Sequence, residues 1–307
     1  MSNPINQHWV PQFYLKHFAI PDSQYSKNPK IWVFSREKGE SDPFLVSVRK
    51  ICAKRYLYSP TSEDGQRYFD LESKLQRMEN ILSATWPYIA ENFVDLSDEP
   101  IRKGISLFMA TLLLRHPSNM EIYEAMHGNL VRLIGSFPKD DRGLPDVGGL
   151  EINGEFSPLD NSNWGKYKTW EKNDHHHFFV SMVDSQAHWL ANLLMRKRWS
   201  IIFSDAPVFI TSDNPISKQH GKQEKFGFNT PGATILFPLS PTRLLSLDDR
   251  MQEPANQYYS LGVHGPGPIN LLVWRNATLM LCNRHPNFVM SEIIEWEDKY
   301  ERENLSR

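Results

Sequence analysis

The sequence has little cysteine, no long apolar run and no signal-peptide pattern. Only Cys52 and Cys282 occur among the 307 residues, so we expect two buried thiols and no disulfide framework. The longest apolar stretch, Ile105 to Leu114, is about half of the roughly 20 residues that a membrane span needs. No basic segment followed by an apolar core opens the chain. These absences predict a cytoplasmic protein that makes no contact with a membrane.

The chain also lacks an excess of charge of one sign. Its 34 lysines and arginines nearly balance 36 aspartates and glutamates, for a formal charge of −2. Bulk charge therefore excludes a basic nucleic-acid platform, and any nucleic acid or nucleotide has to bind in a local pocket. Two short basic clusters beside aromatic residues could track a phosphate backbone, or they are ordinary surface. They are Lys50, Lys54 and Arg55, and Arg196 to Arg198.

Established catalytic motifs are missing as well. The sequence contains no glycine-rich P-loop or dinucleotide motif, no HExxH zinc motif, no GxSxG nucleophile motif and no CxxC. These absences remove support for P-loop nucleotide-binding proteins, zinc proteases, α/β hydrolases and dithiol redox proteins. Function has to be sought in less regular groups of polar residues.

Helical and strand-like patterns both occur along the chain, which predicts an α+β fold. Apolar residues recur at three- and four-residue spacings over 68–93, 99–116, 118–134 and 178–194, so we expect a mainly helical core. Pro87 should kink the first of these helices or begin a second piece of helix. Strands or antiparallel hairpins are predicted within 30–59 and 198–248, with turns at Asp205 to Pro207 and at Pro241. Further helices should begin at Pro11 and cover 268–282 and 286–303.

The N-terminal strands need partners later in the chain, so we expect one interwoven domain over residues 1–307. Residues 135–174 are dense in Gly, Pro, Asp and Asn. About 40 residues is long for an unstructured connection in a compact domain. We therefore predict a long loop or lid here, which is also the candidate subdomain boundary.

The first candidate site lies at the N-terminus and contains His8, Gln12, Tyr14 and Lys16. On a helix that starts near Pro11, Gln12 and Lys16 share a face, and His8 could lean over the first turn. An imidazole, an amide and an ammonium group could then bind one phosphate, with His8 as acid or base. Alternatively, His8 and Gln12 hold the N-terminal segment in the fold and Lys16 is solvated.

The second candidate is the pair Arg115 and His116, which ends a very apolar helix. A cation at this position complements the helix C-terminus, which is a structural reason for its presence. The same position could present two polar side chains to an anion beyond the core. Both interpretations stay open.

The third candidate is the strand end Thr211 to Asn214, in the segment FITSDNPI. Asp213 and Asn214 could coordinate a divalent cation or orient a substrate, whereas an Asx turn explains the same residues without a ligand. A metal site needs further carboxylates. Glu72 and Glu79 lie on one helix face, too far apart to chelate one ion alone, and either could join Asp213 or be solvated.

A histidine run, His175 to His177, followed by His188 suggests a metal site. No cysteine and no pair of carboxylates accompanies these histidines in the sequence. Zinc sites usually combine closely spaced ligands from several segments. An ordinary structural role for the histidines is the alternative.

The motifs resemble those of the domain-of-unknown-function family 4238. HWVPQFYLKHF resembles the opening motif of that family and TSDNP a second specific motif, with LLRHP, FPLSP and INLLVWRNA in the expected order. The resemblance implies a bacterial or phage-associated intracellular protein, and some relatives are single-gene anti-phage defence factors. It implies no settled activity. The matching positions are His8, Gln12, Tyr14, Lys16, Arg115, Asp213 and Asn214.

We therefore expect an anti-phage defence effector that acts on a nucleic acid or nucleotide by phosphodiester cleavage. His8 is expected to be the general acid or base, and Lys16 and Arg115 to hold phosphate. Asp213 is expected to orient the nucleophile or bind a cation such as Mg²⁺. The other expected substrate contacts are Gln12, Tyr14, His116 and Asn214. The alternatives are a non-catalytic sensor that recognises a phage component or partner protein, and a purely structural role for these polar residues.

Overall fold

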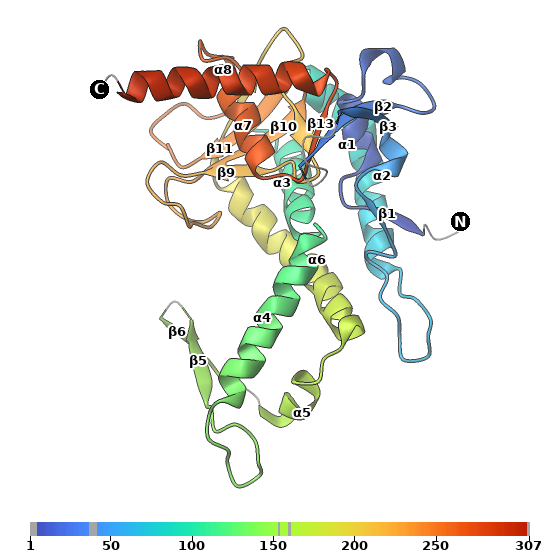
Figure 1. Ribbon diagram of the computed structural model, residues 1–307, viewed down its shortest axis with the longest axis vertical. Helices are drawn as coiled ribbons and strands as arrows, with labels where there is room; N and C mark the ends of the chain where they lie inside the picture. The colour runs from blue at the N-terminus through green and yellow to red at the C-terminus, as the bar shows by residue number, and fades with distance from the viewer. Residues whose placement is uncertain (1–4, 37–41, 153, 159–160, 306–307) are drawn as a thin grey trace.

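The computed structural model describes residues 5–36, 42–152, 154–158 and 161–305 of the chain. Figure 1 shows a body of two β-sheets with helices around them, and a largely helical arm that leads away from it. The α+β class expected from the sequence is confirmed. Among the described residues, no helix combines the length and the apolar character needed to cross a bilayer.

The larger sheet has five strands in the order β12-β7-β11-β10-β9. Its hairpin is β10 (Thr234–Ser240) and β11 (Arg243–Asp248), which turns at Pro241 as expected. β7 (Arg198–Phe203) and β9 (Ser217–Gln219) flank the hairpin in antiparallel pairings, and β12 (Gln257–Ser260) pairs with β7 in parallel. Nearly every residue of β10 and β11 is buried, because helices cover this sheet.

The smaller sheet has four strands in the order β3-β2-β13-β8. β2 (Lys30–Ser35) and β3 (Phe44–Ser47) form an antiparallel pair, and residues 37–41 between them lie outside the described part of the chain. β13 (Leu279–Cys282) lies between β2 and the short β8 (Thr211–Ser212). The first and last thirds of the chain therefore share one sheet.

Two local expectations are wrong. The segments 198–203 and 211–212 do not form a hairpin, because β7 and β8 belong to different sheets. The helix expected over 268–282 is α7 (Gly267–Arg275), which ends before Asn276, and the apolar run after it is β13. A short apolar run fits either a helix or a strand, and here pairing with β2 decides the outcome.

Three long helices form the helical part of the core. α2 (Asp70–Glu91) contains Pro87 and continues past it, α3 (Glu99–Leu114) is capped by the Asp98 carboxylate, and α6 (Lys172–Met195) packs along α3. Asp98 accepts a hydrogen bond from the backbone N–H of Ile101, as an aspartate at an N-cap does. α8 (Pro286–Leu305) packs on α7 at the edge of the body.

An aromatic cluster joins the helices to the larger sheet. Tyr14, Trp86, Phe108 and Phe237 are fully buried and their rings lie 5.1 to 6.1 Å apart between centroids. Phe237 comes from β10, Trp86 from α2 and Phe108 from α3. The cluster therefore fixes α1 (Gln12–His17), which carries Tyr14, against elements from the middle and end of the chain.

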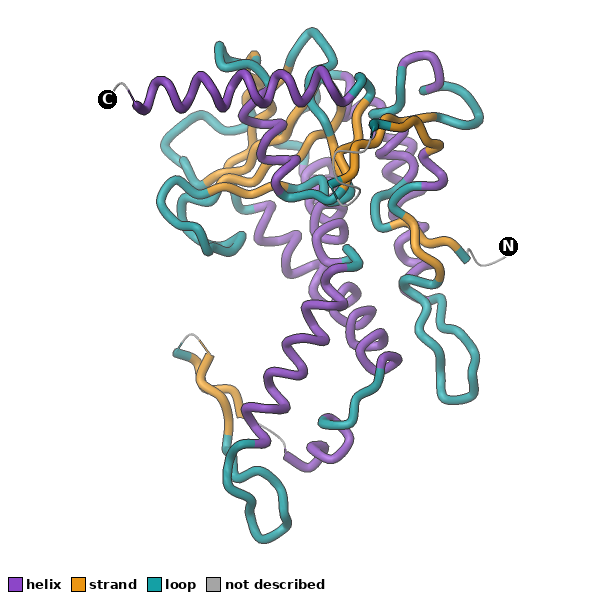
Figure 2. Tube along the Cα trace, in the orientation of Figure 1, coloured by secondary structure: helices purple, strands orange, loops and turns teal. Residues whose placement is uncertain are grey.

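The arm contains α4 (Ser118–Gly135) and the segment that was expected to be a long loop. This segment holds a small hairpin, β5 (Gly149–Ile152) and β6 (Glu155–Pro158), the 3₁₀ turn η3 (Asn161–Asn163) and the short helix α5 (Trp164–Tyr167). Residues 153 and 159–160 of it lie outside the described part. Figure 2 shows the hairpin and α5 near the far end of α4. A role as lid or boundary stays a prediction, as does the single domain.

Short elements near the N-terminus complete the fold. β1 (Asn6–His8) pairs antiparallel with β4 (Ala53–Arg55), with His8 opposite Ala53. The 3₁₀ turns η1 (Pro21–Ser23) and η2 (Val48–Lys50) flank the strands of the smaller sheet. This arrangement places β1 and α1 beside α2.

Candidate functional site

Two buried hydrogen bonds of Gln7 anchor the strand β1, which carries the first residues of the candidate site. The side chain of the buried Gln7 donates to the Ser59 hydroxyl at 2.8 Å and accepts from the backbone N–H of Tyr58 at 2.6 Å. Because side chains alternate along a strand, an inward Gln7 places His8 on the other face of β1. Pro11, as N-cap, then starts α1 with Gln12 at its first turn.

A pocket of about 300 Å³ lies between this N-terminal segment and α2. The residues that α2 contributes recur at helical spacing and form one polar face. The lining residues are Asn6, His8, Gln12 and Phe13 from the N-terminal segment, and Glu72, Gln76, Glu79, Asn80 and Ser83 from α2. His8 and Gln12, both expected to belong to a site, thus meet Glu72 and Glu79, which sequence reasoning treated separately.

His8 lines this pocket, and one of its ring nitrogens is buried. Its Nε2 atom is buried and makes no hydrogen bond to any described residue. Burial lowers the pKa of His8, the positive charge of Arg115 lowers it further, and backbone interactions with Arg49 and Val48 oppose the shift. His8 is therefore neutral near pH 7, in the state that can accept a proton.

Glu72 is buried and carries a strongly shifted pKa. Burial raises the pKa of its carboxyl to about 7, and the negative charge of Glu79 contributes to the rise. Arg115 and a hydrogen bond from the Gln76 amide, 3.3 Å from Oε1, act in the opposite direction. A carboxyl that titrates near neutrality can donate a proton under physiological conditions, which suits a general acid.

Arg115 lies behind the pocket and binds Glu79. Its side chain is fully buried, Nη1 donates to Glu79 Oε1 at 2.7 Å, and Nε donates to the Trp9 carbonyl at 2.9 Å. Its Nη2 atom has no partner in the part of the chain that the structure describes. The guanidinium thus neutralises one of the two carboxylates and keeps hydrogen-bonding capacity beside the pocket.

The neighbouring His116 does not line the pocket. Its Nδ1 atom lies 2.7 Å from the Ser118 hydroxyl, and its ring meets the Trp9 ring edge-on. Burial lowers the pKa of His116 to about 4, so the ring is neutral at pH 7. These contacts place His116 at the junction of α3 and α4.

Tyr14 and Lys16 also lie away from the pocket. The Tyr14 hydroxyl is fully buried, donates to the Pro238 carbonyl at 2.8 Å and lies 2.7 Å from Thr211 Oγ1. Burial raises the pKa of Tyr14 far above its usual value, so it stays protonated. Lys16 is exposed on the outer face of α1 and is not among the lining residues.

Asp213 and Asn214 hold a turn of the smaller sheet. Asp213 Oδ1 accepts from the backbone N–H groups of Thr278 and Leu279, both at 3.0 Å, and the Asn214 amide donates to the Asn276 carbonyl. These bonds join β8 to the chain that enters β13. Trp9 connects this turn to Arg115, because its indole N–H donates to the Asp213 carbonyl at 3.0 Å. Asp213 and Asn214 do not line the pocket.

The structure gives each histidine of the 175–177 run a separate partner. His175 contacts the His127 ring, His176 the Leu57 carbonyl and His177 the Thr61 carbonyl. Within the described ranges, no three His, Cys, Asp or Glu side chains are grouped so that they could hold a metal ion.

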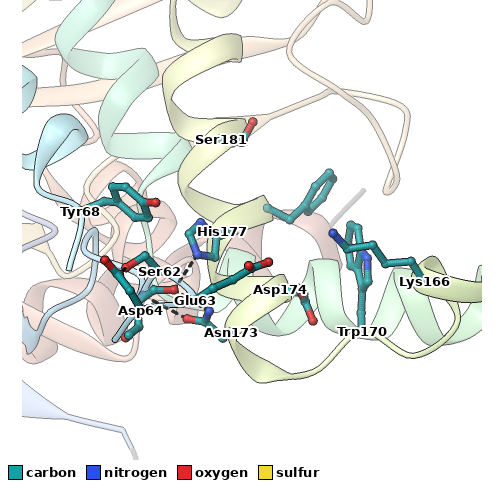
Figure 3. Close-up of a pocket in the computed structure, with 12 residues that line it drawn as sticks. Ser62, Glu63, Asp64, Tyr68, Lys166, Trp170, Asn173, Asp174, His177 and Ser181 are labelled. Carbon is teal, nitrogen blue, oxygen red and sulfur yellow. Dashed lines mark hydrogen bonds between the residues drawn. The ribbon is translucent and has the colours of Figure 1, made fainter. Parts of the chain in front are cut away.

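A second and larger hollow, of about 700 Å³, lies between the loop 61–68 and the start of α6 (Figure 3). Asn173 joins the two walls, since its amide group exchanges hydrogen bonds with the backbone of Thr61. Trp170 contributes an aromatic surface to this groove, and Glu63 and Lys166 enter from opposite sides. The groove does not contain the His8 and Glu72 pair.

A family model matches nearly the whole chain. The model of the family described as "Protein of unknown function (DUF4238)" matches residues 6–301. The chain belongs to this family. No curated protein and no solved structure gives a significant match. The DUF4238 match begins at β1 and therefore includes every residue of the pocket.

Sequence reasoning about this DUF4238 chain missed the remaining polar face of α2. Gln76, Asn80 and Ser83 line the pocket together with the two glutamates. Their positions, four, eight and eleven residues after Glu72, are those of one helix face, so the helical periodicity could have found them. What periodicity could not show is that this face meets β1.

Proposed function

We propose that the chain is a hydrolase-type enzyme that cleaves phosphodiester bonds, with His8 and Glu72 as its proton-transfer pair. One observation carries the proposal: a neutral imidazole with an unpartnered Nε2 and a carboxyl with a pKa near 7 line the same pocket. A catalytic acid and base are usually two titratable groups whose surroundings shift their pKa values in opposite directions. Both are in the required state at a pH somewhat below 7.

The reaction we propose is cleavage of RNA, because RNA supplies its own nucleophile. His8 removes the proton of a ribose 2′-hydroxyl, and the 2′-oxygen attacks the neighbouring phosphorus. The bond from phosphorus to the 5′-oxygen breaks, and Glu72 donates its proton to that oxygen. The products are a 2′,3′-cyclic phosphate and a free 5′-hydroxyl. Arg115, which is bound to the lining residue Glu79, adds a buried positive charge that can stabilise the developing negative charge.

The size and polarity of the pocket favour a short single-stranded substrate. Its volume of about 300 Å³ is at the low end of small-molecule sites, which suits one nucleotide unit and not a duplex. Amide side chains from both walls offer donors and acceptors for a base or ribose: Asn6, Gln12, Gln76 and Asn80. With Glu72 protonated and Glu79 neutralised by Arg115, the pocket does not repel a phosphate strongly.

The pH dependence of cleavage follows from the two pKa shifts. We expect the rate to be highest slightly below pH 7 and to fall about tenfold per pH unit above it, because Glu72 loses the proton that it must donate. The rate should also fall at acid pH, once His8 becomes protonated below its lowered pKa. Initial rates on a fluorescent RNA oligonucleotide across this range test the prediction. A rate that is constant from about pH 6 to pH 9 would contradict it.

We also propose that this activity serves in defence against phage, which rests on the motif resemblance described above. Cells that express the parent chain should lower the plating efficiency of a susceptible phage, and cells that express His8→Ala should not. Equal protection by both chains, at equal protein levels, rejects a catalytic role in defence.

The alternative is a sensor that binds a phage component or a partner protein, and the groove beside Trp170 favours it. Tryptophan is a frequent anchor of binding interfaces, and this one lies in the larger of the two hollows described above. The plating assay separates the two functions. A sensor loses protection with Trp170→Ala and keeps it with His8→Ala, whereas the enzyme shows the opposite pattern.

A further inference from the structure

The larger sheet packs on the helices with one face and borders a pocket of about 420 Å³ with the other. Trp199 and Ile201 of β7 belong to the helical core. Because side chains alternate along a strand, Arg198, Ser200 and Ile202 lie on the opposite face, where they line the pocket. The segment after β12 and the start of α7 form the facing wall. This pocket shares no lining residue with the candidate site described above.

Two buried serines form the polar part of the pocket floor. Ser200 of β7 and Ser246 of β11 lie opposite each other in the antiparallel pairing and are 4% and 5% exposed. Both line the pocket, and neither hydroxyl makes a hydrogen bond to any described residue. Burying a hydroxyl without a partner is unfavourable. Two such serines at facing positions of one sheet therefore indicate a ligand that pairs with them.

The charged groups at one end of this floor neutralise each other. Arg198 donates to both carboxylate oxygens of Asp248, with Nε at 2.8 Å from Oδ1 and Nη2 at 2.6 Å from Oδ2. Arg250 binds the same carboxylate, and Glu253 lies 3.3 Å from both guanidinium groups. Two cations thus meet two anions. The part of a ligand that is buried here is therefore expected to be uncharged.

Aliphatic side chains form the walls of the pocket. Ile202 comes from the sheet, and Leu261, Pro268 and Ile269 come from the facing segment. Apolar walls with a polar strip between them favour a flat ring that has apolar faces and hydrogen-bonding groups along its edge. A sugar would leave most of its hydroxyls without partners here, and a hydrocarbon would leave both serines without one.

We propose that this pocket binds a nucleobase. A serine hydroxyl both donates and accepts, so Ser200 and Ser246 can pair with either kind of group on the edge of the base. The ribose then lies toward the mouth of the pocket, where the side chain of Arg250 is 56% exposed. The volume of about 420 Å³ lies within the range of small-molecule sites. The proposal does not depend on the cleavage reaction, because the two pockets are separate.

Isothermal titration calorimetry with the four ribonucleosides and their 5′-monophosphates tests this site. At least one of the nucleosides should bind the parent chain with a Kd on the order of 10 to 100 µM. Ser200→Ala and Ser246→Ala should each weaken binding about tenfold, the usual effect of losing one hydrogen bond. Neither variant should lower the melting temperature, because neither hydroxyl has a partner to lose in the described chain. Tighter binding of a monophosphate supports a nucleotide as the occupant, and tighter binding of a nucleoside supports the free nucleoside.

Ser240→Ala is the matched control. Ser240 is also buried in the larger sheet, but its hydroxyl donates to the Ala90 carbonyl at 2.9 Å and it does not line the pocket. This variant should lower the melting temperature and leave binding unchanged. His8→Ala should also bind like the parent, and loss of binding in His8→Ala would place the nucleoside in the other pocket and overturn the proposal. Absence of binding by all eight compounds, or equal binding by the parent and both pocket variants, overturns it as well.

Discussion

Replacing Glu72 by glutamine is expected to lower the rate of RNA cleavage about 10²- to 10⁴-fold, the usual contribution of a general acid. Glutamine keeps the size of the side chain and its contact with Gln76 but has no proton of suitable pKa to donate. His8→Ala should cause a loss of the same order, because it removes the proposed base. Single-turnover rates at saturating RNA measure both effects, and they separate proton transfer from binding.

The exposed Glu99 of α3 provides the control, since Glu99→Gln removes a carboxylate far from the pocket and should cleave like the parent.

A second readout shows whether Glu72→Gln acts through the carboxyl itself. The raised pKa of Glu72 means that the folded state holds a proton that the unfolded state releases above its ordinary pKa of about 4.5. Stability of the parent therefore falls as pH rises from about 4.5 to about 7, and glutamine removes this loss. Glu72→Gln should stabilise the chain more at pH 8 than at pH 5, and an equal effect at both would contradict the shifted pKa.

Replacing Arg115 by methionine is expected to lower the free energy of unfolding by about 3–5 kcal/mol, one of the largest effects of any substitution in the site. The Arg115 side chain is fully buried, and its loss leaves Glu79 without its partner and the Trp9 carbonyl without its donor. Urea unfolding at neutral pH measures the change. Cleavage by the folded fraction should fall as well, because the cation beside the pocket is gone.

A double variant separates the ion pair from packing. Arg115→Met combined with Glu79→Gln should recover part of the lost stability, because no carboxylate is then left uncompensated. Lys103→Ala breaks an exposed pair with Glu99 and should leave stability almost unchanged, because solvent screens that pair. If Arg115→Met lowers the free energy of unfolding no more than Lys103→Ala does, the buried ion pair of Arg115 with Glu79 contributes little to stability.

Much of the fold could be predicted from local patterns. The periodicity of α2 and α3, the Asp98 cap and the hairpin at Pro241 all depend on residues close in the sequence, and the structure has them. The errors concern pairing over long distances. β8 and β13 join the sheet that contains β2, and no local pattern predicts which sheet a short strand joins.

The pocket shows the same limit. His8 and Gln12 could be predicted as site residues because Pro11 marks the start of a helix, with Gln12 in its first turn and His8 just before it. Glu72 and Glu79 could be predicted because they share a helix face. Their meeting depends on Gln7, whose buried bonds to Tyr58 and Ser59 place β1 beside α2. The pKa of Glu72 is likewise a property of the assembled pocket, since burial and Glu79 set it. The same assembly leaves Lys16 on the outside and Tyr14 in the core.

Incubation of the purified chain with single-stranded RNA and with DNA of the same sequence, with Mg²⁺ or with chelator, shows directly whether the chain cleaves RNA. We expect cleavage of RNA alone, in both solutions, with products that end in a 2′,3′-cyclic phosphate, and no cleavage by His8→Ala or Glu72→Gln. Intact RNA after incubation with the parent chain, or equal cleavage by the parent and the two variants, would contradict the assignment of His8 and Glu72 as the catalytic pair.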